Sequence, residues 1–204
     1  MHPARQGALR TRVYVDGYNL YYGCLKNTAH KWLDLRALIG RVLANVPYER
    51  NGEPVNYEFR VPAIKYFTAP ILSSFARAED SVACQSQYHA ALRGHLGNEL
   101  EIIAGYYDAR PARAHTLVKG KAAGESPVVD IWKLEEKQSD VALALHAFCD
   151  AVLNNVDQVI VMTNDSDFAP AMRMIRRHTN VILGLIVPVR DGDGRGVTAR
   201  HASG

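Results

Sequence analysis

The chain alternates short apolar runs with apolar residues at helical spacing. The nearly continuous apolar runs predict strands buried on both faces, at residues 12–16, 59–67, 101–107, 158–162 and 181–187. Apolar positions three or four residues apart predict helices at residues 32–46, 79–96, 139–153 and 169–178. Alternating strands and helices are typical of a parallel sheet covered by helices, so the sequence predicts an α/β sandwich.

Polar and glycine-rich stretches mark the limits of this predicted domain, which we place at residues 12–188. Residues 1–11 are expected to be a disordered lead, and residues 189–204 a flexible, Gly-rich tail. Two internal stretches predict a loop at 47–56 and a loop or irregular ribbon at 108–128. Pro62 lies within the second predicted strand and is expected to disturb its pairing.

Composition narrows the class of protein without naming a function. With 48% hydrophobic and 22% charged residues, the chain is typical of soluble globular proteins. The net charge of +3 does not by itself indicate a nucleic-acid binder. Three widely spaced cysteines argue against a disulfide framework and a zinc knuckle. No signal peptide and no run near the roughly 18 apolar residues of a membrane span are found, so we expect a cytoplasmic protein without a membrane partner.

Four acidic residues stand where a parallel sheet places its ligands. Asp16 ends the first predicted strand, Asp165 and Asp167 follow the strand at 158–162, and Asp140 begins a long apolar helix. Ligands of such sheets bind at the carboxyl ends of the strands. Clustered carboxylates repel one another, and a divalent cation relieves this repulsion. Oxygen ligands without histidine or cysteine favour Mg²⁺ or Mn²⁺.

Each acid taken alone also fits a structural role. Asp is common in turns and as a helix N-cap, and Asp167 precedes the helix expected at 169–178. The hypothesis of a site therefore depends on the combination of the four acids with Asn19, three residues after Asp16.

Three motifs resemble those of the NYN domain family, a branch of the PIN-like ribonucleases. The first is Val-Tyr-Val-Asp-Gly-Tyr-Asn-Leu at 13–20, the second is Lys-Gln-Ser-Asp-Val-Ala-Leu at 137–143, and the third is Thr-Asn-Asp-Ser-Asp-Phe-Ala-Pro at 163–170. The segment at 87–92 also resembles the middle helix of that family. Asn164 stands where the family usually has glycine, and the loop at 47–58 is longer than usual.

The resemblance implies a three-layer α/β/α sandwich with a mainly parallel central sheet and a Mg²⁺-dependent ribonuclease site. Asp16, Asp140, Asp165 and Asp167 match the acidic positions of the family, and Asn19 matches its neighbouring polar residue. This chemistry is hydrolysis of a phosphodiester bond that leaves a 5′-phosphate and a 3′-hydroxyl. Asp16 and Asp165 are expected to bind the metal directly. Asp140 and Asp167 are expected to bind through water or to orient the nucleophile, and Asn19 to hold a metal water or a phosphate oxygen.

Basic and aromatic residues are candidates for RNA contacts. The expected RNA is single-stranded, and the candidate phosphate-binding residues are Arg110, Arg113, Lys119, Lys121 and Arg173. Candidates for stacking on bases are Tyr21, Tyr22, Tyr106 and Tyr107. Such charges also occur on ordinary solvated surfaces, and such tyrosines also pack against sheets.

Two other functions remain open at this stage. One is an RNA-binding or regulatory adaptor with this fold and little turnover. The other is a phosphatase, which would need a second Asp two residues after Asp16, where Tyr18 stands. The sequence also leaves open endonuclease against exonuclease action, one metal against two, and whether the chain forms a homo-oligomer.

Overall fold

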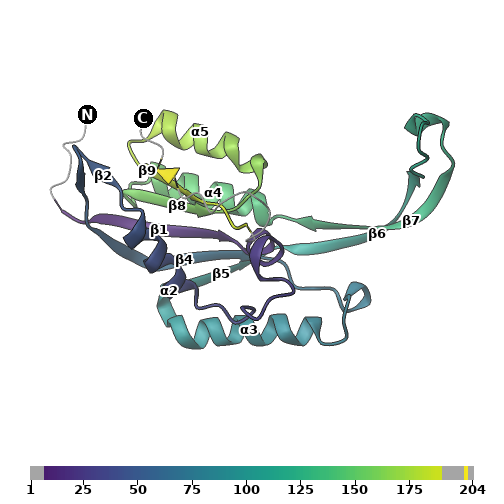
Figure 1. Ribbon diagram of the computed structural model, residues 1–204, viewed down its shortest axis with the longest axis horizontal. Coiled ribbons are helices and arrows are strands. Elements are labelled where there is room, and N and C mark those ends of the chain that lie inside the picture. Colours follow the sequence, from purple (N-terminus) through teal and green to yellow (C-terminus); the bar gives the residue numbers. More distant parts are fainter. Residues whose placement is uncertain (1–6, 190–199, 202–204) are drawn as a thin grey trace.

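The centre of the fold is a mainly parallel sheet (Figure 1). The computed structural model describes residues 7–189, 200 and 201. Five parallel strands are β1 (Leu9–Asp16), β4 (Tyr57–Thr68), β5 (Leu100–Ala104), β8 (Gln158–Met162) and β9 (Ile182–Ile186). A short β10 (Arg200–His201) adds antiparallel to β9, and the strand order is β10-β9-β8-β1-β4-β5.

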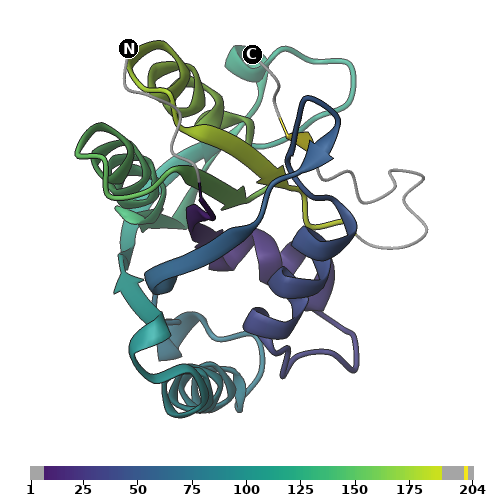
Figure 2. The same cartoon turned by 90° about the vertical axis from the view of Figure 1, so that its left-hand side faces the viewer.

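Helices cover both faces of this sheet, as Figures 1 and 2 show. On one side are α2 (Leu35–Asn45) and α3 (Ser81–Leu96), and on the other are α4 (Ser139–Val152) and α5 (Ala169–His178). Shorter helical segments are α1 (Gly17–Leu20), the π-helical η1 (Tyr21–Leu25) and the 3-10 turns η2 (Ser73–Phe75), η3 (Gly97–Glu99), η4 (Ala123–Glu125) and η5 (Ser166–Phe168). The predicted three-layer α/β/α architecture is confirmed.

The side-chain alternation of β1 builds one core on each face of the sheet. Val13 and Val15 pack in a cluster with residues of α2 and α3, whereas Tyr14 packs with residues of α4 and α5. All three side chains are fully buried. The strand is therefore apolar on both faces because helices cover both of them.

The order of the strands fixes where a ligand would bind. The chain builds β1, β4 and β5 outward in one direction, then crosses to the other face through α4 and adds β8 and β9 beside β1. Such a reversal leaves a crevice at the carboxyl ends of the two strands where the order changes. Here these strands are β1 and β8, which end at Asp16 and Met162.

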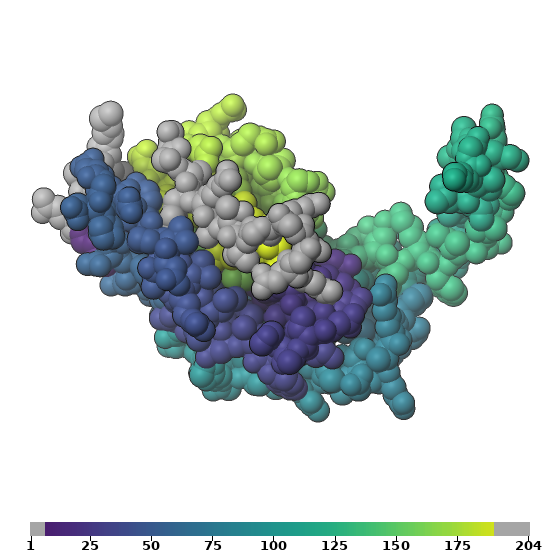
Figure 3. Space-filling model, in the orientation of Figure 1, coloured from purple at the N-terminus to yellow at the C-terminus, as the bar shows by residue number. Residues whose placement is uncertain are grey.

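The segment expected to be a loop or irregular ribbon is a regular antiparallel arm. β6 (Tyr106–His115) pairs with β7 (Val128–Lys137) along ten residue pairs, and the arm projects away from the body (Figures 1 and 3). β7 is rich in β-branched and aromatic residues, which favour strands. The glycine and proline content of the segment belongs largely to its turn, so composition alone concealed the ribbon.

Two other expectations change in detail. The predicted loop at 47–56 contains a small hairpin of β2 (Glu49–Arg50) and β3 (Glu53–Pro54). Asn51 and Gly52 have positive φ angles of 55° and 82°, as a two-residue hairpin turn requires. The expected disturbance at Pro62 is confirmed, because the β1–β4 register shifts between Thr11 and Val13.

The ends of the domain differ from the expected limits. The lead predicted over residues 1–11 overlaps β1, which begins at Leu9 because Arg10 is tied to Asp157 by an ion pair of 2.8 Å. Within the predicted tail at 189–204, Arg200 and His201 form β10, and residues 190–199 and 202–204 lie outside the described residues. Among the helices that the structure describes, none is long and apolar enough to cross a membrane.

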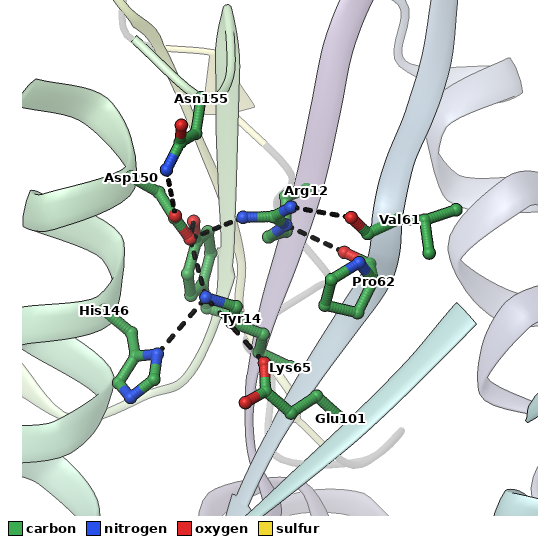
Figure 4. A network of polar contacts seen from close by, with 9 residues as sticks. All are labelled: Arg12, Tyr14, Val61, Pro62, Lys65, Glu101, His146, Asp150 and Asn155. Carbon is green, nitrogen blue, oxygen red and sulfur yellow. Dashed lines mark hydrogen bonds and ion pairs between the residues drawn. The ribbon is translucent and has the colours of Figure 1, made fainter. Parts of the chain in front are cut away.

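A buried ionic network fixes α4 to the sheet (Figure 4). One carboxylate oxygen of Asp150 on α4 accepts hydrogen bonds from Tyr14 at 2.7 Å and Lys65 at 2.8 Å, and pairs with Arg12 at 2.7 Å. Asn155 donates to the other oxygen at 3.0 Å. Burial raises the pKa of Asp150, but the hydrogen bonds from these donors outweigh it and hold the pKa well below its usual range.

We predict that Asp150→Asn lowers the free energy of unfolding by about 3–5 kcal/mol, because it leaves the buried Arg12 without its counter-charge and Lys65 with only a longer pair of 3.9 Å to Glu101. The matched control is Glu99→Gln, which breaks the exposed pair with Arg36 and should cost about 1 kcal/mol or less. Urea denaturation of the wild type and both variants measures the difference. Equal losses in the two variants would show that the network does not hold α4 in place.

Candidate metal centre

Asp16 is held rigidly at the end of β1. It is buried, and one carboxylate oxygen accepts from the backbone NH of Asn19 at 3.0 Å, which makes Asp16 the N-cap of α1. The other oxygen accepts from the Asn19 amide and from the Thr163 hydroxyl, the latter at 2.9 Å. The capping role considered for these acids therefore applies to Asp16, and it orients the carboxylate at the switch between β1 and β8.

The turn after β8 supplies the next two acids. Asp165 is half-buried and caps η5 by accepting from the Asp167 backbone NH at 2.8 Å. Its own NH donates to the Thr163 hydroxyl at 3.1 Å, so Thr163 connects Asp165 to Asp16. Asp167 is exposed, and the cap of this turn is Asp165 rather than Asp167. Asn164, which replaces the usual glycine, has no positive φ angle.

The charges of the other acids act on Asp140. It lies in the first turn of α4, and its pKa is raised to about 6, first by desolvation and then by the charges of Asp16, Glu136, Asp165 and Asp167. The charges of the other three predicted acids all act on Asp140, so the four acids lie in one region of the structure. Glu136 on β7 is a fifth member of this acidic cluster.

Two glycines allow the backbone segments around the cluster to meet. A Cβ atom on Gly17 would lie 2.7 Å from the Phe67 carbonyl oxygen and from the ring of Tyr66. A Cβ atom on Gly105 would overlap the Lys137 carbonyl oxygen. Larger residues would push β4 away from α1, and would push the base of the arm away from the start of α4.

The donors fit a hard divalent cation in kind and charge, but they are not arranged as a closed cage. In the part of the chain that the structure describes, no group of three or more His, Cys, Asp or Glu side chains is placed to hold a metal ion. Mg²⁺ is usually held by one or two carboxylates, and its remaining positions are filled by water and substrate phosphates. An acidic cluster that does not enclose a cation by itself is compatible with that open type of site.

Tyrosines surround one side of the acidic cluster. Tyr18, Tyr21 and Tyr22 follow Asp16 and form a contiguous group of rings, with centroids 4.4 Å apart for Tyr18 and Tyr22 and 5.1 Å for Tyr21 and Tyr22. The Tyr107 hydroxyl donates to Glu136 at 3.4 Å. Tyr106 is exposed on the opposite face of the arm, so the four candidate stacking residues do not form one group.

Of the predicted phosphate-binding residues, two pair with acids of the arm and two lie at its far end. Arg110 pairs with Glu135 at 3.1 Å, and Arg113 pairs with Asp130 at 3.8 Å. Lys119 and Lys121 lie in the turn of the arm, roughly 30 Å from its base if each of ten paired residues spans about 3.4 Å. Arg173 is on α5.

Three contributors to the site were not predicted from the sequence. Thr163 begins the motif at 163–170. Its hydroxyl could have been predicted as part of the site because it directly follows a buried strand. Tyr18 also lies inside a quoted motif, two residues after Asp16, and could have been suspected for that reason. Glu136 carries no such signal, since its position depends on the path of the arm.

Comparison with known proteins agrees with the motifs. A profile of the NYN domain matches residues 10–191. A curated relative is 46% identical over 187 residues and is named 6-hydroxy-3-succinoylpyridine 3-monooxygenase HspA, from Pseudomonas putida (strain DSM 28022 / S16). The match covers 88% of this chain and 60% of the relative, so the chain spans less than two thirds of that protein.

One solved structure is a weaker match. It is a protein of unknown function from Vibrio parahaemolyticus RIMD 2210633, with 19% identity and a TM-score of 0.47 over 90% of this chain and 84% of that chain. The profile match covers most of the sequence and includes every acid of the cluster. The chain belongs to the NYN domain family, a family of PIN-like nucleases.

Proposed function

We propose that this protein is a ribonuclease that hydrolyses phosphodiester bonds of single-stranded RNA with Mg²⁺ or Mn²⁺ bound at the acidic cluster. The raised pKa of Asp140 supports this best, because it reports five carboxylates gathered at the switch between β1 and β8. Carboxylates that repel one another in the free protein gain stability when a cation binds among them.

The fixed carboxylates suit direct coordination. Hydrogen bonds from Asn19 and Thr163 orient Asp16, and a hydrogen bond within its turn orients Asp165. The carboxylate oxygens of both residues are therefore preorganised to hold a cation. A bound Mg²⁺ or Mn²⁺ would supply charge neutralisation at the phosphate and would lower the pKa of the attacking water. Asn19 already binds Asp16, which makes it a positioning residue for that ligand.

Asp140 is suited to accept a proton from the attacking water. Its raised pKa brings it closer to the working pH than that of an ordinary aspartate. The oxygen of water bonds to phosphorus while the bond to the 3′ oxygen breaks, and the departing oxygen takes up a proton. The products are a 5′-phosphate and a 3′-hydroxyl. Asp167, exposed beside it, would hold a water of the same site.

A reducing, cytoplasmic setting is part of the proposal. Cys24, Cys84 and Cys149 form no disulfide among the described residues.

Lys119 and Lys121 lie in the turn between β6 and β7, far from the acids, so their positive charges would contact only RNA long enough to reach them. Changing both lysines to alanine should then weaken binding of a 30-nucleotide RNA but not of a 6-nucleotide RNA, as measured by fluorescence anisotropy.

The function is tested by incubating the pure protein with end-labelled single-stranded RNA in Mg²⁺, Mn²⁺ or EDTA. We expect cleavage with either cation, 5′-phosphate ends in the products, and a loss of about 100-fold or more in Asp165→Asn. Glu53→Gln, which changes an exposed acid on the β2–β3 hairpin, is the control and should keep its rate. Undiminished cleavage in EDTA by metal-free protein would refute the proposed chemistry, and binding without cleavage would favour an adaptor.

Asp140→Asn tests the crowding of charge without using turnover. The pKa of Asp140 is raised, so its contribution to stability is complete below about pH 4 and is lost as the pH rises through about 6. In EDTA, the wild type should therefore lose melting temperature relative to Asp140→Asn between these pH values. Mg²⁺ at pH 7.5 should stabilise the wild type more than the variant. Parallel pH profiles in EDTA would show that Asp140 is not crowded.

The relative named as a pyridine monooxygenase supports a second candidate function, ring hydroxylation of a pyridine. In that reaction one oxygen atom of O₂ enters the ring, and the other leaves as water with two electrons from an added reductant. The test incubates the protein with 6-hydroxy-3-succinoylpyridine, O₂ and a reduced nicotinamide nucleotide, and measures the products by mass spectrometry. A product that carries oxygen from ¹⁸O₂, together with intact RNA in the cleavage assay, would replace the ribonuclease proposal.

A further inference from the structure

Three tyrosine rings lie against the acidic cluster from two distant parts of the chain. Tyr18 and Tyr22 belong to the helical segment that follows Asp16, and Tyr107 lies at the base of the arm. Burial, followed by the charges of Glu136, Tyr22 and Tyr18, raises the pKa of Tyr107, so all four groups lie near one another. The rings of Tyr18, Tyr22 and Tyr107 therefore lie near Glu136, a member of the acidic cluster.

The backbone after β1 brings two of these rings together. Tyr18 is on α1, and Tyr22, four residues later, is on the π-helical η1. Residues four apart lie on the same side of consecutive helical turns, so the two rings stack with centroids 4.4 Å apart and planes inclined by 35°. π-Helical turns are uncommon and are frequently found at functional sites.

Tyr18 is the more exposed ring of this pair, with 47% of the residue exposed against 40% for Tyr22. The ammonium of Lys26 lies 4.7 Å from the centre of the Tyr22 ring, and Tyr21 meets the same ring edge-on. Tyr18 is also two residues from Asp16, the acid that ends β1.

We infer that Tyr18, backed by Tyr22, binds a planar heteroaromatic ring beside the acidic cluster, and that in RNA this ring is an unpaired nucleobase. The inference rests on the proposed function, because it names the feature of the substrate that the same site recognises. Aromatic side chains stack on any base, since every base has a π face. A base inside a duplex has both faces covered by its neighbours, so the platform selects single strands.

A free pyridine has the same chemistry as a nucleobase in this respect. The ring in the printed name of the 46% identical relative is a pyridine. A stacking platform next to acids would therefore serve either candidate function. Experiment has to distinguish a nucleobase of RNA from a free pyridine as the ring that binds.

The experiment measures equilibrium binding in EDTA, where no metal-dependent turnover occurs. The ligands are a 6-nucleotide single-stranded RNA, the same RNA with abasic residues throughout, a 12-base-pair RNA duplex, and 6-hydroxy-3-succinoylpyridine. The proteins are the wild type, Tyr18→Leu, Tyr18→Phe and, as a matched control, Trp32→Leu. Trp32 is also an exposed aromatic, but it packs against Tyr88 on the α3 side.

We expect Tyr18→Leu to weaken binding of the intact single strand by about 5- to 150-fold, the range that corresponds to loss of one base stack. Binding of the abasic strand and the duplex should change less than about twofold. Tyr18→Phe keeps the ring and should bind as the wild type does, and so should Trp32→Leu. Unchanged melting temperatures show that the variants are folded.

The outcomes separate this inference from the proposed function. If Tyr18→Leu weakens binding of the pyridine but the wild type neither binds nor cleaves RNA, the ring site stands and the ribonuclease proposal fails. If RNA is cleaved with Mg²⁺ while Tyr18→Leu binds every ligand like the wild type, the ring site is refuted and the ribonuclease proposal stands. A wild type that binds no ligand with a heteroaromatic ring also refutes the ring site.

Discussion

The carboxylate of Asp150 joins α4 to β1 and β4 through buried ionic hydrogen bonds, and the position of α4 depends on it. Arg12, Tyr14 and Lys65 all reach the same oxygen atom. Removing charges from water is unfavourable, and the cost is offset only when every partner is in place. Any sliding of α4 along the sheet would break these contacts together, so the helix has one stable register.

That register also sets the position of the acidic cluster. Asp140 lies ten residues before Asp150 on the same helix, a rise of about 15 Å. The helix therefore carries Asp150, whose charge is neutralised by cations, over the middle of the sheet, and Asp140, whose charge is not, at the carboxyl edge. At the first end, cations hold the pKa of Asp150 low, and at the second, other acids hold the pKa of Asp140 high. The favourable contacts of Asp150 help to keep Asp140 in a place where it is repelled.

Much of the fold and of the acidic cluster could be predicted from the sequence, because both depend on local signals. Apolar runs located the strands, including β8 (Gln158–Met162) to the residue, and acids after β1 and β8 marked the edge of the sheet. The arm was not recognised as a regular ribbon, because its strands pack on no core and lack a clear apolar face. Glu136 was missed because long-range folding alone brings it to the site. Tyr18 lies within the first motif, but its packing against Tyr22 depends on the fold of the turn after β1.

The central claim is that the acids at the switch between β1 and β8 together bind a divalent cation. It is tested most directly by a crystal structure of the protein grown with Mn²⁺, with anomalous diffraction used to locate the ion. We expect an anomalous peak in contact with Asp16 and Asp165, with Asp140 within reach through one water. A peak elsewhere on the protein, or none at a Mn²⁺ concentration that supports cleavage, would contradict the claim.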